Sequence, residues 1–189
     1  MYNYLRPIKS KSSIVAVIIV CLLLFSQYTF AQDTSETTPQ VGTVQKIGDV
    51  VLIALPAVTL GTSFIIGDNE GAWEFTKGLV LTEAVTYGLK LGINKQRPDR
   101  SNDNSFPSGH TSTVFHSAGY IHRRYGFKYS IPAYALAGFT AASRIDSKKH
   151  DILDVIAGAT IGLGYPIYYS CLIIIIYYVV VIQYFMLIF

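Results

Sequence analysis

Between residues 47 and 164 the pattern of apolar and polar positions shows no strand alternation, and it predicts helices separated by short polar segments. A loop rich in Gly, Asn, Pro, Asp and Ser at 92–107 divides this region. We therefore predict an all-α fold, a bundle of about five to six helices. The predicted helices are 47–66, 72–91, 108–123, 129–143 and one that begins near residue 151.

The predicted helices differ in character. The segment 72–91 carries Glu74, Lys77 and Glu83, so it is amphipathic, and its polar stripe must face the bundle interior, water or lipid headgroups. The segment 129–143 is rich in Ala and Gly, and the next helix contains the stretch IAGATIGLG. Such small residues permit close helix contacts in a membrane.

The two ends of the chain differ from this central region. Basic residues precede an apolar run at 14–25, and Ala31 supplies a small residue for cleavage, which predicts a signal peptide at 1–31 with an uncleaved anchor as the alternative. Residues 32–45 are predicted to form a polar linker and 46–170 the helical domain. The charge-free apolar tail 171–189 is interpreted as a non-native or altered end with no assigned function.

Composition favours a membrane. Of the 189 residues 51% are hydrophobic and only 14% are charged, and 14 tyrosines and 10 phenylalanines suit a lipid and water boundary. The net charge of +3, without a basic run interleaved with aromatic residues, argues against a nucleic-acid partner. Cys21 and Cys171 show no metal-ligand spacing.

Charge also predicts the topology. The segment 122–129 carries Arg123, Arg124 and Lys128 and belongs on the cytoplasmic side by the positive-inside rule. Counting helices from there places the loops after Leu91 and after Ser143 on the outer side.

Two clusters of polar residues flank the first of these outer loops. Lys90 and Arg97 lie seven residues apart, which returns them to one face if the helix continues, and they supply two fixed cations. Ser108 is a good N-cap, and the amides of Ser108 and Gly109 at a helix start are typical of an anion site. His110 would stand at its rim.

A third cluster lies in the stretch SRIDSKKHDILD. Arg144 can hold two phosphate oxygens with its planar guanidinium group. His150 and Asp154 are four residues apart, so the carboxylate can fix the imidazole tautomer. A histidine oriented by an acid and facing cations indicates a nucleophile that attacks phosphorus.

These three clusters, KLGINKQRP, PSGH and SR followed by H and D, resemble the signature motifs of the type 2 phosphatidic acid phosphatase superfamily, which includes bacterial acid phosphatases and vanadium haloperoxidases. The resemblance covers residues 90–154 without a departure. It implies a metal-independent phosphatase without a cofactor, which acts on lipid phosphomonoesters or diphosphates at the outer face of a bacterial-type membrane.

The resemblance also implies residue roles. His150 would attack phosphorus to form a phosphohistidine, Asp154 would orient it, and His110 would protonate the leaving oxygen. The groups that would hold the phosphate oxygens are Lys90, Arg97, Arg144, Ser108 and Gly109.

Other interpretations stay open at this point. A soluble acid phosphatase or a vanadate haloperoxidase uses the same anion site, and an inactive lipid-phosphate binder is the alternative outside enzymology. Lys95 is predicted to be a solvated loop charge and Asp151 an N-terminal helix acid. His116 and His122 match no motif position.

Overall fold

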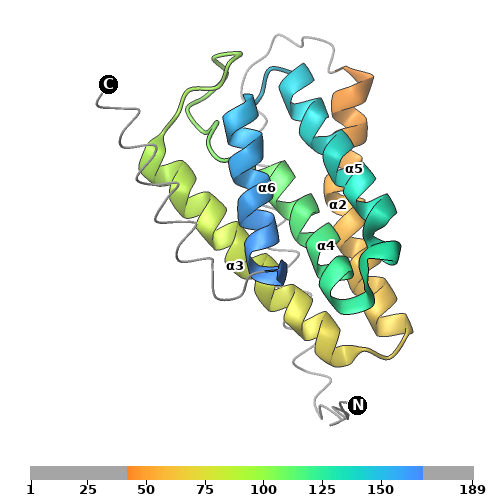
Figure 1. Ribbon diagram of the computed structural model, residues 1–189. Helices are drawn as coiled ribbons and strands as arrows, with labels where there is room; N and C mark the ends of the chain where they lie inside the picture. The colour runs from red at the N-terminus through yellow and green to blue at the C-terminus, as the bar shows by residue number, and fades with distance from the viewer. Residues whose placement is uncertain (1–41, 168–189) are drawn as a thin grey trace. The chain divides into compact units, whose positions relative to one another are not determined.

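A computed structural model describes residues 42–167, and these residues form α-helices without a strand (Figure 1). This confirms the all-α prediction. The predicted signal peptide and the apolar tail lie outside the described residues. The helices are α2 (Thr43–Ile65), α3 (Asn69–Ile93), α4 (Gly109–Tyr125), α5 (Phe127–Asp146) and α6 (Ile152–Ile167).

The helix ends follow local chemistry. Asp68 is the N-cap of α3, and its carboxylate accepts a hydrogen bond from the amide of Gly71 at 2.9 Å. The segment 122–129, predicted as a loop, is helical except at Gly126, whose φ of +103° favours glycine. Helix α2 begins at Thr43, within the segment assigned to the linker.

Helix α4 is the centre of the described bundle and contacts each of the other four helices of residues 42–167. Its apolar contacts are few: Val114 and Ala118 pack with residues of α2 and α5, and Tyr120 packs with Phe75 and Leu79 of α3. The other fully buried side chains of α4 are polar, so the other helices enclose hydroxyl and imidazole groups. The buried polar residues of α4 are Thr111, Ser112, Thr113, His116 and Ser117.

These polar groups have partners, as burial requires. Thr113 Oγ1 donates to Glu83 Oε1 at 2.5 Å, which places this acid of α3 toward the bundle interior. His116 lies between Thr82 Oγ1 and the carbonyl of Phe75, each at 3.2 Å from a ring nitrogen. Of the environments expected for the polar stripe of α3, Glu83 therefore faces the bundle interior.

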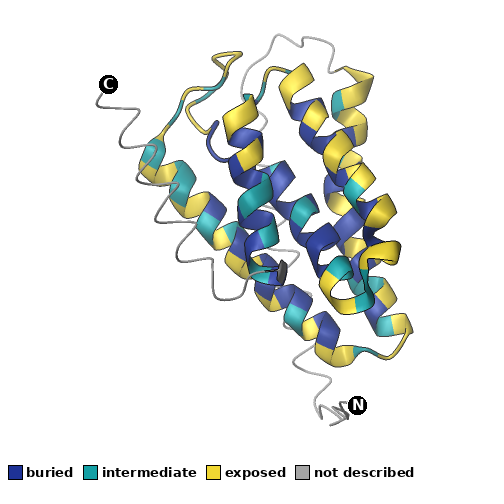
Figure 2. Cartoon of the chain, in the orientation of Figure 1, coloured by how far each residue is buried: buried dark blue, intermediate teal, exposed yellow. Residues whose placement is uncertain are grey.

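The outer surface carries many apolar side chains. Large hydrophobic side chains are exposed on α2, α3, α5 and α6, and none is exposed on α4. Most of α4 is buried (Figure 2). Of the helices in the described region, α2 alone is both long and apolar enough to cross a membrane. The described residues thus form a membrane-associated helical bundle.

Alternating helix directions gather two connecting loops at one end. The loop 94–108 and the shorter loop 147–151 lie at the end where α2 begins, and the turns that join α2 to α3 and α4 to α5 lie at the opposite end (Figure 1). All predicted site residues belong to the first end.

Glycines bring α6 against α4. A Cβ at Gly162 would lie 2.2 Å from the carbonyl oxygen of Ser112, and one at Gly158 would lie 2.4 Å from that of Ser108. Backbone atoms cannot yield as a flexible side chain can, so both positions require glycine. The small-residue stretch predicted to serve close packing does so here.

We predict that Gly162→Ala lowers the stability of the folded bundle, because overpacking against the α4 backbone costs about 1–3 kcal/mol. The control is Gly138→Ala on α5, where a Cβ meets nothing within 4 Å and alanine improves helix propensity. Thermal unfolding in detergent measures both. An equal or higher melting temperature for Gly162→Ala would contradict the packing described.

Candidate active site

His150 lies in the loop between α5 and α6, and its side chain is buried. The amides of Lys149 and His150 donate to the carbonyl of Arg144 at 3.1 and 3.2 Å, which ties this loop to the end of α5. The imidazole Nδ1 lies 2.6 Å from the carbonyl oxygen of Ser105. Because a carbonyl only accepts, Nδ1 carries the proton and Nε2 carries the free lone pair.

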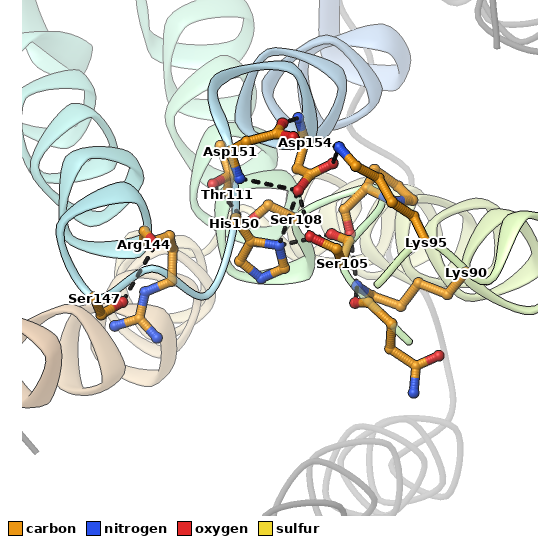
Figure 3. Close-up of polar contacts among 12 residues, drawn as sticks. Lys90, Lys95, Ser105, Ser108, Thr111, Arg144, Ser147, His150, Asp151 and Asp154 are labelled. Atoms are coloured by element: carbon orange, nitrogen blue, oxygen red, sulfur yellow. Dashed lines mark hydrogen bonds and ion pairs between the residues drawn. The ribbon is translucent and has the colours of Figure 1, made fainter. Parts of the chain in front are cut away.

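Asp154 holds this arrangement from the first turn of α6. Its fully buried carboxylate accepts hydrogen bonds from Lys95 Nζ at 2.8 Å, Ser105 Oγ at 2.5 Å and the amide of Asp151 at 3.0 Å (Figure 3). Asp154 Oδ2 lies 3.8 Å from His150 Nδ1. The predicted pair is therefore adjacent, and Ser105 links the two groups through its hydroxyl and its carbonyl.

The prediction that Lys95 is a solvated loop charge is wrong. Its ammonium group bridges the carboxylates of Asp151 and Asp154. Asp151 is an N-terminal helix acid as predicted: its Oδ1 accepts from the amide of Asp154 at 3.0 Å, and the Asp154 carboxylate accepts from the Asp151 amide in return. These reciprocal bonds are those of a capping box.

A second group of contacts surrounds His110, in the first turn of α4. Its Nε2 lies 2.9 Å from Asp49 Oδ1, and Nη1 of Arg144 lies 2.9 Å from the same oxygen. Arg144 also donates to the carbonyl of Gln45 at 2.8 Å and to Ser143 Oγ at 3.2 Å. Three of its five N–H groups are thus engaged, and two are left for another acceptor.

The remaining predicted cations differ in their contacts. Lys90 Nζ donates to the carbonyls of Asn104 and Pro107 at 2.8 and 2.6 Å, so it braces the loop 94–108. Arg97 Nε is the one buried side-chain polar atom in the described part of the chain without a hydrogen-bond partner. A buried donor of this kind indicates an acceptor that the protein does not supply.

The predicted amides at the start of α4 are not equally available. Ser108 occupies the N-cap position, as predicted, but its side chain makes no capping hydrogen bond. Its amide donates to the carbonyl of Asp154 at 2.9 Å, and its hydroxyl accepts from Thr111 Oγ1 at 2.9 Å. The expectation that the Ser108 amide faces an anion therefore does not fit this structure. Gly109 is the buried first residue of α4.

The electrostatics connect these groups. Burial lowers the pKa of His150 to about 4; Asp154 opposes this shift, and the charges of Lys90 and Arg97 add to it. Burial also lowers the pKa of His110, with Asp49 opposing and the charges of Arg144 and Arg97 adding to the shift. Arg97 therefore acts on both imidazoles, and His150 is neutral at neutral pH.

Burial alone would raise the pKa of the Asp154 carboxyl, but His150, Lys95 and Ser105 hold it well below its ordinary range. This acid is thus ionised whenever the imidazole beside it is neutral. A fixed negative charge next to His150 is the condition for stabilising a positive charge on that ring.

A neutral buried imidazole with a free lone pair, under the charges of Lys90 and Arg97, defines a site suited to phosphate esters. Residues 71–179 match the model of the PAP2 superfamily, and the chain belongs to this family. This confirms the resemblance drawn from the three motifs.

Two curated relatives are phosphatases. The chain is 34% identical over 134 residues to the lipid A 4'-phosphatase of Helicobacter pylori strain J99. The aligned residues make up 65% of this chain and 67% of that protein. The chain is 38% identical over 89 residues to the lipid A 1-phosphatase of Porphyromonas gingivalis, which covers 46% of this chain and 20% of that protein. No solved structure matches the chain. With the family, these relatives support the prediction that the chain is a phosphatase.

Three residues of this end of the bundle were missed as parts of the site by sequence reasoning. Ser105 and Lys95 are common loop residues without a motif position, and no pattern marked them. Asp49 had a signal: it is an ionisable residue inside the apolar segment that became α2, and such residues are usually functional.

We predict that Lys95→Met lowers kcat/KM about ten- to hundredfold, because it removes a charged hydrogen bond worth about 1.5–3 kcal/mol from the carboxylate that supports His150. Phosphate release from an aryl phosphate measures the loss. The matched control is Lys128→Met at the opposite end of the bundle, which should retain activity. Equal activity of the two variants would contradict the role assigned to the Lys95 contact.

Proposed function

We propose that this protein is a phosphomonoesterase of the bacterial cell envelope that removes a phosphate group from a lipid A-type glycolipid. One observation carries the chemistry: His150 donates Nδ1–H to a backbone carbonyl and keeps an unprotonated Nε2. Such a ring is a nucleophile whose orientation is fixed before the substrate arrives.

In the proposed reaction, His150 Nε2 attacks phosphorus in line with the leaving alkoxide oxygen. The N–P bond forms as the P–O bond breaks, and His110 transfers a proton to the departing oxygen. Water, deprotonated by His110, then attacks the phosphohistidine, releases inorganic phosphate and restores both imidazoles. Asp154 stabilises the positive charge that develops on His150.

The phosphate oxygens are proposed to be held by the cations of this end of the bundle. Arg97 has a buried Nε without an acceptor, and Arg144 has two N–H groups left. Lys90 contributes charge while it braces the loop, and the amide of Gly109 completes the site at the start of α4. Ser108 supports this site by anchoring α4 to the carbonyl of Asp154.

The lipid substrate is supported by the apolar outer surface and by the names of the two relatives, both lipid A phosphatases. Exposed Ile152, Leu153 and Ile156 of α6 lie next to the buried Asp154. This apolar surface beside the site supports approach of a lipid phosphate from the membrane. The site is proposed to face the periplasm, because Arg123, Arg124 and Lys128 lie at the opposite end of the bundle.

We predict that the full-length protein releases phosphate from bisphosphorylated lipid A with EDTA present, and that His150→Ala lowers the rate at least about a thousandfold. The matched control is His122→Ala, whose imidazole contacts Tyr134 at the other end of the bundle. Mass spectrometry of the product identifies which phosphate is lost.

Polyprenyl diphosphate, phosphatidic acid and a soluble aryl phosphate are tested in parallel. A higher kcat/KM for one of these than for lipid A would contradict the substrate. Undiminished turnover by His150→Ala would contradict the nucleophile, and a requirement for added metal would contradict the mechanism.

A further inference from the structure

Asp49 is the acidic residue of α2, and it lies outside the segment that matches the family, which begins at residue 71. Its Oδ1 is nevertheless within 2.9 Å of both His110 Nε2 and Arg144 Nη1. A residue from the first described helix thus joins the proposed acid to one of the proposed phosphate-binding cations.

The backbone of α2 is built for this approach. A Cβ at Gly48 would lie 2.3 Å from Ser143 Oγ and 2.7 Å from Arg144 Nη2, so glycine lets α2 come close to α5 directly before Asp49. One turn earlier, the carbonyl of Gln45 accepts from Arg144 Nη2 at 2.8 Å. Two bonds from α2 therefore fix the plane of this guanidinium group.

The contact also determines the protonation of His110. An ionised carboxylate only accepts, so Nε2 of His110 carries a proton and Nδ1 is the nitrogen left to exchange a proton with the substrate. To act as an acid, this ring must hold both protons. A carboxylate at hydrogen-bond distance stabilises that doubly protonated form.

We propose that Asp49 is a positioning residue that keeps the His110 ring oriented and protonated and holds the Arg144 guanidinium beside it. This proposal rests on the proposed function, since it concerns the proton delivered to the leaving oxygen. Asp49 does not touch the phosphate itself in this account.

The charges around His110 come from several elements. Arg144 of α5 and Arg97 of the loop 94–108 oppose its protonation, as does burial, and Asp49 favours it. On α3, Glu83 accepts a hydrogen bond from Thr113, one turn further along α4.

On the side of α6, Asp154 is bound to Lys95 and Ser105, and His150 is neutral. The Asp49 carboxylate lies at hydrogen-bond distance from the His110 ring.

The test uses full-length Asp49→Asn, which keeps the shape of the side chain and removes its charge. Kinetics are measured with two phosphate esters, one with a nitrophenol leaving group and one with a simple alcohol. An alcohol needs a proton as it departs, and nitrophenol does not. Because an asparagine Oδ1 still accepts from Arg144 but carries no charge, we expect kcat/KM to fall at least about tenfold for the alkyl ester and less than about twofold for the nitrophenyl ester.

The pH profile supplies a second readout. Because His110 acts in its protonated form, kcat/KM falls as the pH rises through its pKa, and loss of the Asp49 charge lowers that pKa. The descending limb should move to lower pH by about one unit. The matched control is Asp146→Asn at the exposed end of α5, which should change neither readout.

An equal decrease of kcat/KM for the two esters, together with an unchanged descending limb of the pH profile, would overturn the proposal, because it indicates a structural role only. A lower KM for Asp49→Asn would also overturn the proposal. It would indicate that the Asp49 carboxylate competes with the substrate phosphate for the same cations.

Wild type and His150→Ala are assayed alongside. Equal turnover by these two proteins would refute the proposed function. In that case the positioning role is tested by an NMR titration of His110, and an equal His110 pKa in wild type and Asp49→Asn would refute it.

Discussion

The structure depends on the pairing of charges that are buried at one end of an apolar bundle. The side chains of Arg144 and Asp154 are about 2% and 0% exposed, and an unpaired charge at such depth costs several kcal/mol. Each is satisfied by a distant segment: Arg144 by α2, and Asp154 by the loop 94–108. These pairings fix the ends of α5 and α6, and with them the loop that carries His150.

The polar central helix follows from the same constraint. Helix α4 contacts each of the other described helices, and most of its buried side chains carry hydroxyl or imidazole groups, while many large apolar side chains of its neighbours are exposed. Glycines at 158 and 162 let α6 approach the α4 backbone, where the amide of Ser108 binds the carbonyl of Asp154. Close packing thus sets the distance between α4, which carries His110, and α6, whose first turn carries Asp154.

Much of the fold and part of the site could be predicted from the sequence. Polar loops and capping residues marked all five helices to within a few residues, and the motif spacing indicated His110, Arg144, His150 and Asp154. The partners of these groups could not be predicted, because Asp49 and Lys95 are separated from them by more than 50 residues. The acceptor of a backbone amide also depends on tertiary packing, which no local sequence pattern contains. The amide of Ser108, for example, donates to the carbonyl of Asp154.

The central claim is that His150, held by Ser105 and Asp154 with Nε2 unprotonated, takes the phosphoryl group. Rapid quenching in alkali during turnover of a labelled lipid phosphate, followed by mass spectrometry of the peptides, tests it most directly. The account predicts an acid-labile, alkali-stable phosphate on the peptide that contains His150, formed faster than phosphate release or at the same rate. Label on another residue, or single-turnover release without any phosphorylated peptide, would contradict it.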